Sequence, residues 1–243
     1  MRLLLVSGDA AFNMALDELL LNLATEIGPT IRFYRFSPSA ITIGYFQRVE
    51  DAINLEEARK LGISFVRRMT GGGAVYHDEN GEITYSVVLP ARESVLESFK
   101  RICNGVVLTL RRMGIPAEFS PINDVVVNKK KISGSAQTRR FGFLLQHGTI
   151  MYGTDLNVME KVLLPPKKLA QKGLSSIRDR VTTAEMELGR RISFDEILSY
   201  AIKGFSEALG DKLDEVGLEE LSIKDRIREI EAKYRSREWN WMR

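Results

Sequence analysis

Hydrophobic residues recur at helical spacing in several segments of the chain. After Asp9, a good N-cap residue, an apolar side chain returns every three or four positions as far as Leu23. We therefore predict a first helix here, with a polar side that carries Asn13, Glu18 and Asn22. The same spacing predicts further helices at residues 55–61, 95–113, 194–209 and 222–234.

Runs of alternating or β-branched apolar residues predict the strands. They cover residues 31–36, 40–43, 63–69, 83–89, a hairpin over 125–132, and 143–151 with a break at Gly148. Strands and helices are interleaved without a regular strand–helix–strand rhythm. We therefore expect an α/β (α+β-like) domain with a central mixed β-sheet flanked by helices. We expect this domain to cover residues 1–212 and a helical appendage to cover residues 213–243.

The composition excludes several classes of function. The chain has 243 residues, 44% hydrophobic and 28% charged, which is typical of a folded globular protein. No apolar run approaches the roughly 20 residues that span a bilayer, so we expect no membrane partner. With one cysteine and two histidines we expect no structural metal, and we expect a cytoplasmic location. A net charge of +3 permits an anionic ligand but does not indicate nucleic acid.

The first candidate site is the glycine-rich segment Arg67-Arg68-Met69-Thr70-Gly71-Gly72-Gly73-Ala74, which follows a predicted strand. Consecutive glycines let the backbone approach a ligand and direct several N–H groups into one concavity. The two arginines at the mouth of this loop supply donors for a phosphate or a carboxylate. A flexible loop with solvated arginines fits the pattern equally well. No Gly-Lys-Ser/Thr follows, so the segment is not a P-loop.

The second candidate site is the predicted hairpin, with its three lysines and the small residues 133–135 that follow. A basic triplet at a hairpin is usually a solvated turn. If Ile132 faces the core, however, Lys131 points to the opposite face, where it can reach a phosphate as a point charge. Asp124, one strand away, is either a ligand for Mg²⁺ or a turn residue.

The histidines and the cysteine fit structural roles better than catalytic ones. A lone histidine in a strand is more often hydrogen-bonded than catalytic, and neither His77 nor His147 has a Ser or Asp at esterase spacing. Cys103 lies on the apolar stripe of the predicted helix 95–113, which indicates a buried thiol. The basic run at residues 167–173 favours a solvated face over an anion site.

Together these segments resemble the lipoate–protein ligase family, part of the biotin/lipoate ligase and transferase superfamily. The similarity runs from about Asn13 to Trp241. Its motifs stand in the family's order at residues 66–78, 123–124, 131–136, 147–149 and 168–182. The resemblance implies a fold like that of the catalytic domains of biotin protein ligase and class II aminoacyl-tRNA synthetases.

The resemblance also implies a reaction. ATP, with Mg²⁺, would activate lipoate or octanoate to an acyl-adenylate, and the acyl group would pass to a lysine of another protein. The implied acceptors are lipoyl domains of 2-oxoacid dehydrogenase acyltransferase subunits and the glycine-cleavage H protein. The alkyl or dithiolane tail would need an apolar tunnel.

The resemblance further assigns roles to individual residues. Lys131 would be the catalytic residue, placed between the acyl carboxylate and the α-phosphate. Asp124 would bind Mg²⁺. The nucleotide or adenylate would contact Arg68, Gly71, Gly72, Gly73, Ala74, Val75, His77, Asn123, Asp124, Ser135 and Ala136. The acyl group would contact Thr70, His77, His147, Gly148 and Thr149.

Two alternatives to the ligase stay open. Some relatives transfer octanoyl or lipoyl groups from acyl carrier protein by means of a cysteine shortly before the central motif. Residues 82–86 and 134–139 resemble those transferases as much as the ligases, but residues 117–120 hold no thiol, which favours the ligase. A non-catalytic nucleotide- or RNA-binding module is supported only by the small positive charge.

The C-terminus departs from the longer ligases, which continue into an accessory domain. This chain stops soon after Trp241, so we expect a separate small protein to supply that domain near Trp239 and Trp241. Packing of both tryptophans on their own domain is the alternative.

Overall fold

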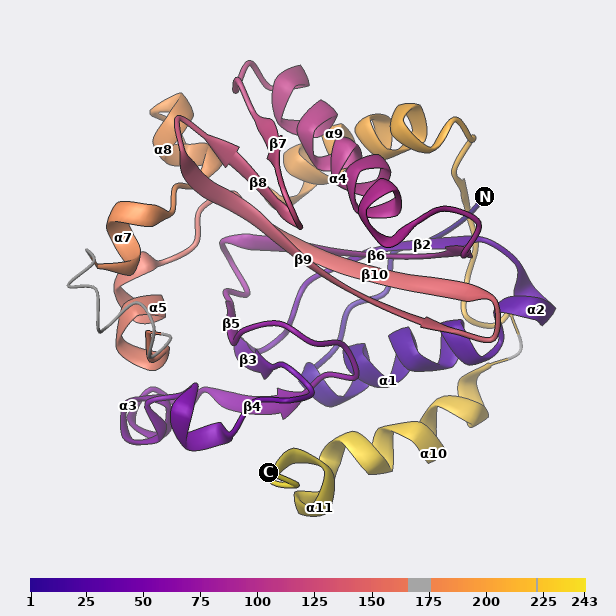
Figure 1. Cartoon of the computed structure of the whole chain (residues 1–243), viewed down its shortest axis with the longest axis horizontal. Helices are drawn as coiled ribbons and strands as arrows, with labels where there is room; N and C mark the ends of the chain where they lie inside the picture. Colours follow the sequence, from indigo (N-terminus) through magenta and orange to yellow (C-terminus); the bar gives the residue numbers. More distant parts are fainter. Residues whose placement is uncertain (166–175, 222) are drawn as a thin grey trace.

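The strands of the protein form two sheets, which Figure 1 shows in a computed structural model that describes residues 1–165, 176–221 and 223–243. The large sheet has the order β11-β1-β2-β6-β10-β9-β8-β7, and the small sheet has the order β4-β3-β5. The strands are β1 (Arg2–Leu4), β2 (Thr30–Tyr34), β3 (Ala40–Ile43), β4 (Ser64–Arg67), β5 (Val75–His77), β6 (Glu82–Pro90), β7 (Glu118–Ser120), β8 (Asp124–Val127), β9 (Lys130–Arg140), β10 (Phe143–Met151) and β11 (Asp214–Glu215).

Helices cover both faces of the large sheet. In Figure 1, α4 and α9 lie on one face, and α1 and α10 lie on the other. The described helices are α1 (Ala10–Asn22), α2 (Ala24–Ile27), α3 (Leu55–Lys60), α4 (Val95–Arg112), α5 (Leu156–Val162), α7 (Ile177–Arg180), α8 (Ala184–Leu188), α9 (Phe194–Leu209), α10 (Lys224–Arg235) and α11 (Arg237–Asn240), with the 3-10 turn η1 (Val49–Asp51).

The large sheet is mixed. Its central strands β2, β6, β10 and β9 are antiparallel neighbours, whereas β1 runs parallel to β2. The predicted fold class, a mixed sheet flanked by helices, is therefore confirmed.

Strand β6 shows how the sequence separates the core from the site. Ile83, Tyr85 and Val87 join the apolar core that α4 and α9 cover. The alternate residues Thr84 and Ser86 point to the other face, where their hydroxyl groups donate to buried carboxylates. Because successive side chains of a strand point to opposite faces, one short segment builds both the core and a polar layer.

Strand β10 is continuous, so the predicted break at Gly148 is wrong. The residue pairs with Tyr85 on one side and Ser135 on the other. A Cβ at Gly148 would lie 2.7 Å from both the Ser135 Oγ and the Tyr85 Oη atoms. This close packing, rather than a turn, requires glycine here.

Helix α1 begins as predicted, since the Asp9 carboxylate accepts from the Phe12 N–H group at 2.9 Å. The predicted polar side of this helix is not a solvent-exposed face, because Asn13 and Glu18 are both buried. Asn13 donates to backbone carbonyl groups, and Glu18 accepts from Tyr234 of α10. Helix α1 is thus enclosed between the large sheet and α10.

Two consecutive predicted strands are in separate sheets. β2 belongs to the large sheet and β3 to the small one, so the segment 37–39 between them carries the chain from one sheet to the other. This connection places the small sheet beside the polar face of β6.

The C-terminal segment packs on the rest of the chain. Strand β11 pairs with β1, and α10 packs against α1. Trp239 donates its indole N–H to the Arg67 carbonyl at 2.7 Å, while Trp241 is 38% exposed and contacts Phe65 edge-on. Trp239 therefore packs on its own fold, and the division at residue 212 stays a prediction. Among the described helices, none is both long and apolar enough to span a bilayer.

Candidate functional site

A cavity of about 620 Å³ lies between the glycine-rich segment and strands β8, β9 and β10. It brings together most of the predicted site residues, although they come from three separate parts of the sequence. Those that line it are Arg68, Gly72, Gly73, Ala74, Val75, His77, Asn123, Asp124, Lys131, Ser135, Ala136, His147, Gly148 and Thr149. A more open hollow beside α4 contains none of these residues.

Lys131 projects into this cavity from β9. The neighbouring Ile132 is buried in the core on the α4 side, so Lys131 points to the opposite face, as the alternation predicts. Its Nζ atom lies 2.6 Å from Asp124 Oδ1, as an ion pair rather than an aligned hydrogen bond. A Cβ at Gly134 would lie only 2.5 Å from the same Nζ atom, so glycine makes room for the ammonium group.

Two glycines let the loop opposite Lys131 pack closely. Gly72 has a φ angle of 94°, which favours glycine. A Cβ at Gly44, just after β3, would lie 2.0 Å from the Gly72 carbonyl oxygen. The loop is therefore held by direct backbone contact with the end of β3, and Gly72 and Gly73 line the cavity.

Arg68 braces the loop from within. Its Nε donates to Thr70 Oγ1 at 3.1 Å, and one Nη donates to the carbonyl and the hydroxyl of Thr42, both at 3.2 Å. The other Nη donates to the carbonyl oxygens of Gly71 at 2.7 Å and Gly73 at 2.8 Å. Burial lowers the pKa of Arg68 to about 10. All five of its N–H donors are used, so a phosphate contact would require breaking one of these bonds.

Arg67 does not lie at the mouth of the loop, and the prediction that it does is wrong. Its guanidinium is buried and donates to the carbonyl oxygens of Trp239 and Asn240 in the C-terminal segment. It also donates to the carbonyl oxygens of Gly44 and Gln47. Arg67 is the last residue of β4 and Arg68 follows it directly, so their side chains point to opposite sides of the extended chain.

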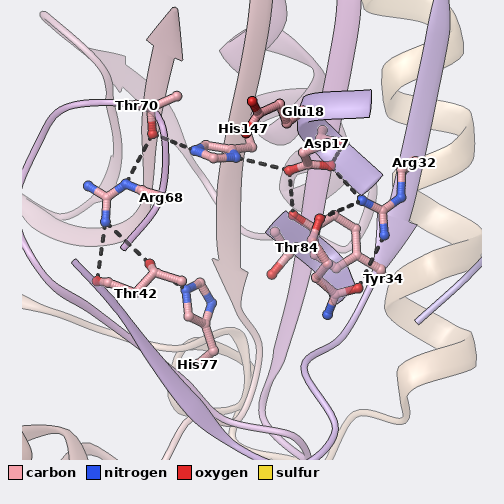
Figure 2. A network of polar contacts seen from close by, with 12 residues as sticks. Asp17, Glu18, Arg32, Tyr34, Thr42, Arg68, Thr70, His77, Thr84 and His147 are labelled. Atoms are coloured by element: carbon pink, nitrogen blue, oxygen red, sulfur yellow. Dashed lines mark hydrogen bonds and ion pairs between the residues drawn. The ribbon is translucent and has the colours of Figure 1, made fainter. Parts of the chain in front are cut away.

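The two histidines are buried, and each connects a carboxylate to a threonine, as Figure 2 shows in part. His147 Nδ1 lies 3.0 Å from Asp17 Oδ2, and its Nε2 lies 2.7 Å from Thr70 Oγ1. His77 Nδ1 lies 2.6 Å from Glu82 Oε1, and its Nε2 lies 2.9 Å from the Thr42 hydroxyl. Thr70 and Gly71 do not line the cavity, so the predicted contact of Thr70 with the acyl group lacks support from the geometry.

Asp17 does not line the cavity but contacts His147, which does, and sequence reasoning missed it. It is 1% exposed and accepts from Arg32, Ser86, Tyr34 and His147. Burial by itself would raise the pKa of Asp17, but the Arg32 charge and the hydrogen bonds from His147 and Ser86 lower it below its ordinary value. The available signal was a carboxylate in the middle of a leucine-rich helix.

The pKa of His147 predicts a pH dependence of stability. Burial lowers this pKa below its ordinary value of 6.5, although Asp17 opposes the shift. The unfolded chain therefore binds more protons than the folded one below pH 6.5, and the free energy of unfolding falls as the pH drops. One proton contributes at most about 1.4 kcal/mol per pH unit. Urea titrations at pH 7.5 and 5.5 measure the loss, and His147→Gln should reduce it; an equal loss in this variant would contradict the assignment.

Cys103 does not line the cavity, although its neighbour Ser135 does. Its thiol is fully buried in the core between the large sheet and α4, with Sγ 3.4 Å from Ser135 Oγ. Burial raises the pKa of this thiol, which keeps it protonated. The predicted buried cysteine is confirmed.

The lining of the cavity includes apolar side chains that suit an alkyl chain. Methionine and aromatic side chains from several elements line it, namely Met14, Phe36, Tyr76, Met151 and Met159. Unbranched methionines adapt to irregular aliphatic ligands. This lining includes helix residues as well as the expected strand residues.

The structure describes only part of the segments predicted to bind a metal or to resemble the ligases. Within residues 1–165, 176–221 and 223–243, no three His, Cys, Asp or Glu side chains converge as a metal cluster. Asp124, the predicted Mg²⁺ ligand, is paired with Lys131, and its metal role stays a prediction. Residues 168–175 of the ligase-like stretch lie outside the described residues, whereas Asp179, Arg180 and Val181 line the cavity.

Comparison with known proteins identifies relatives over nearly the whole chain. The model of the lipoyl protein ligase A/B catalytic domain matches residues 9–206. An octanoyltransferase LipM from Brevibacillus brevis is 35% identical, over 96% of this chain and 95% of the relative. The LipM octanoyltransferase of Geobacillus kaustophilus is 36% identical, over 96% of this chain and 94% of the relative.

Solved structures agree with this relationship. A bipartite lipoate protein ligase from Thermoplasma acidophilum has a TM-score of 0.84 at 35% identity, covering 99% of this chain and 95% of that one. Lipoate-protein ligase A bound with ATP has a TM-score of 0.84 at 32% identity, covering 99% and 98%. Biotin protein ligase from Aquifex aeolicus, at 20% identity and a TM-score of 0.52, shares the fold, over 86% and 70% of the two chains.

These relatives overturn one prediction from the sequence. The ATP-dependent ligase was favoured because residues 117–120 hold no thiol, yet the curated relatives matched over almost their full length are named octanoyltransferases. The absence of a thiol at residues 117–120 is therefore not enough to identify the chain as a ligase. The coarser conclusion holds, and the chain is an enzyme of the lipoyl protein ligase A/B catalytic domain family.

Proposed function

We propose that the protein transfers an octanoyl group from the thioester of acyl carrier protein to a lysine of a lipoyl domain. The names of the curated relatives support this transfer. The observation that carries it is one cavity lined by a lysine ammonium group, a glycine-rich loop and apolar side chains. A cytoplasmic location and a separate accessory protein stay predictions.

The site's charges suit the transfer of an acyl group to an amine. The acceptor lysine nitrogen attacks the thioester carbonyl, so that a C–N bond forms and the C–S bond breaks. The proton of the amine leaves with the thiol of the carrier. Negative charge grows on the carbonyl oxygen, and the Lys131 ammonium group neutralises it. Asp124 keeps that ammonium group in place through their 2.6 Å ion pair.

The transfer is direct in this proposal. Cys103 is buried on the α4 side of the sheet, with a raised pKa, so it is poorly placed to attack a carbonyl in the cavity. Two substrates must then reach the cavity together. The glycines around residue 72 permit a close approach of the acyl group to the backbone, and Met151 and Met159 contact its alkyl chain.

A comparison of acyl donors tests this function. Purified full-length protein and a lipoyl domain are incubated with octanoyl-acyl carrier protein without ATP, or with octanoate and ATP. We expect octanoylated acceptor lysine from the thioester, detected by mass spectrometry, because the carrier thiol is a good leaving group. Product formed from octanoate and ATP but not from the thioester would refute the proposal.

A further inference from the structure

Two similar chains of hydrogen-bonded polar side chains end on Arg68. Figure 2 shows the first of them, from Asp17 through His147 and Thr70, and the contact of Arg68 with Thr42 from the second. One starts at Asp17 on α1, and the other starts at Glu82 on β6. Each consists of a buried carboxylate, a histidine and a threonine, and each ends on a different nitrogen of the same guanidinium group. Their members come from five strands and helices or the loops between them, so local sequence does not bring them together.

The first chain fixes the tautomer of His147. The Asp17 carboxylate can only accept, so His147 Nδ1 must carry the proton. In the neutral ring, Nε2 is then an acceptor, and the Thr70 hydroxyl donates to it at 2.7 Å. The lone pair of Thr70 Oγ1 is left to accept from Arg68 Nε at 3.1 Å. The donor and the acceptor of every hydrogen bond in this chain are therefore fixed.

The second chain repeats this logic. Glu82 Oε1 also accepts from the Thr84 hydroxyl at 2.9 Å, which marks it as an acceptor for His77 Nδ1. His77 Nε2 then accepts from the Thr42 hydroxyl at 2.9 Å. Thr42 Oγ1 accepts from an Arg68 Nη at 3.2 Å. His77 is further held by Phe36, whose ring stacks on it with centroids 3.8 Å apart.

Arg68 connects both chains to the glycine loop through hydrogen bonds. The Nη group that neither threonine contacts donates to the carbonyl oxygens of Gly71 and Gly73. Gly72 and Gly73 line the cavity opposite Lys131. A rotation of the guanidinium would therefore displace the loop backbone from the reacting group.

We propose that Asp17 and Glu82 are positioning residues that orient Arg68, and through it the glycine loop, by fixing the tautomers of His147 and His77. Neither carboxylate contacts Arg68 itself; each acts through its histidine and threonine. The inference depends on the proposed function in one respect only, namely that the glycine loop binds the octanoyl substrate. The NMR measurements below are made on the ligand-free protein, so this inference can fail while the proposed octanoyl transfer is correct, and the transfer can fail while this inference is correct.

Nitrogen-15 NMR of the histidine rings tests the direction of both chains. The sequence has two histidines, so two ring patterns are expected, assigned with His77→Gln. At pH 7.5 we expect both rings to be protonated on Nδ1 and bare on Nε2, and Glu82→Leu to change the His77 pattern only. A ring protonated on Nε2, or on both nitrogens, in the unmodified protein would overturn the proposal.

Matched threonine variants test the connection to Arg68. Thr70→Val removes the hydroxyl at nearly constant volume, whereas Thr70→Ser keeps it. We expect Thr70→Val to shift the Arg68 Nε–H signal and to lower kcat for octanoyl transfer about tenfold, the effect of one lost buried hydrogen bond. Thr70→Ser should keep the signal and most of kcat. Equal behaviour of the two variants would show that the chain does not position Arg68.

Discussion

Lys131→Ala should lower the rate of octanoyl transfer by about 10²- to 10³-fold, the effect of removing one preorganised donor to a developing oxyanion. The side chain is 41% exposed and its ion pair with Asp124 is partly solvated, so its loss costs about 0–1 kcal/mol of stability. The variant should therefore lose most of its activity while it keeps nearly all of its stability. Initial rates by mass spectrometry and urea unfolding measure the two effects.

A neighbouring lysine supplies the control. Lys130 precedes Lys131 on β9 but is exposed and does not line the cavity. Lys130→Ala removes the same charge from the chain, so it should leave the transfer rate within about twofold. If both variants lost activity equally, the positive charge of the hairpin, and not the position of Lys131, would explain the effect.

Gly134→Ala should lower the transfer rate about tenfold or more without unfolding the protein. The new methyl group would lie 2.5 Å from Lys131 Nζ and 2.6 Å from its Cε, so this flexible side chain must move. The clash falls on the end of a lysine rather than on backbone, which keeps the structural cost small. The misplaced ammonium group no longer meets the carbonyl oxygen.

The double variant decides whether the two changes act through the same atoms. If Gly134→Ala harms the enzyme only by displacing Lys131, it should add almost nothing to Lys131→Ala, because the two effects are not additive. If the fold-losses of the two single variants multiplied in the double variant, the methyl group would disturb the substrate or the strand directly. Rates of the four proteins in this cycle are compared under one set of conditions.

Much of the fold could be predicted because the spacing of apolar residues and the helix-capping residues were clear in the sequence. Asp9 capped α1, and the alternation around Ile132 put Lys131 on the face that lines the cavity. The local pattern failed at Gly148, where glycine is required by two side chains from other strands. It also failed for Glu18, whose burial depends on α10, more than 200 residues away.

Some residues of the candidate site could likewise be predicted from local sequence, and others could not. Residues in the glycine loop and the hairpin carry local signals, and the structure brings most of them to one cavity. Glu82 carries no such signal, and that of Asp17 is only a carboxylate within a leucine-rich helix, because the roles of both depend on histidines far along the chain or on another strand. The choice between ligase and transferase rested on a missing cysteine, and the curated relatives contradicted it.

The location of the octanoyl group during one turnover tests the direct transfer most sharply. Enzyme, octanoyl-acyl carrier protein and lipoyl domain are mixed without ATP, quenched over time and weighed intact by mass spectrometry, alongside Cys103→Ala. The account predicts that the octanoyl mass passes from carrier to acceptor with none on the enzyme, and that Cys103→Ala keeps this course. An octanoyl adduct on Cys103, or no acceptor product unless ATP is added, would contradict it.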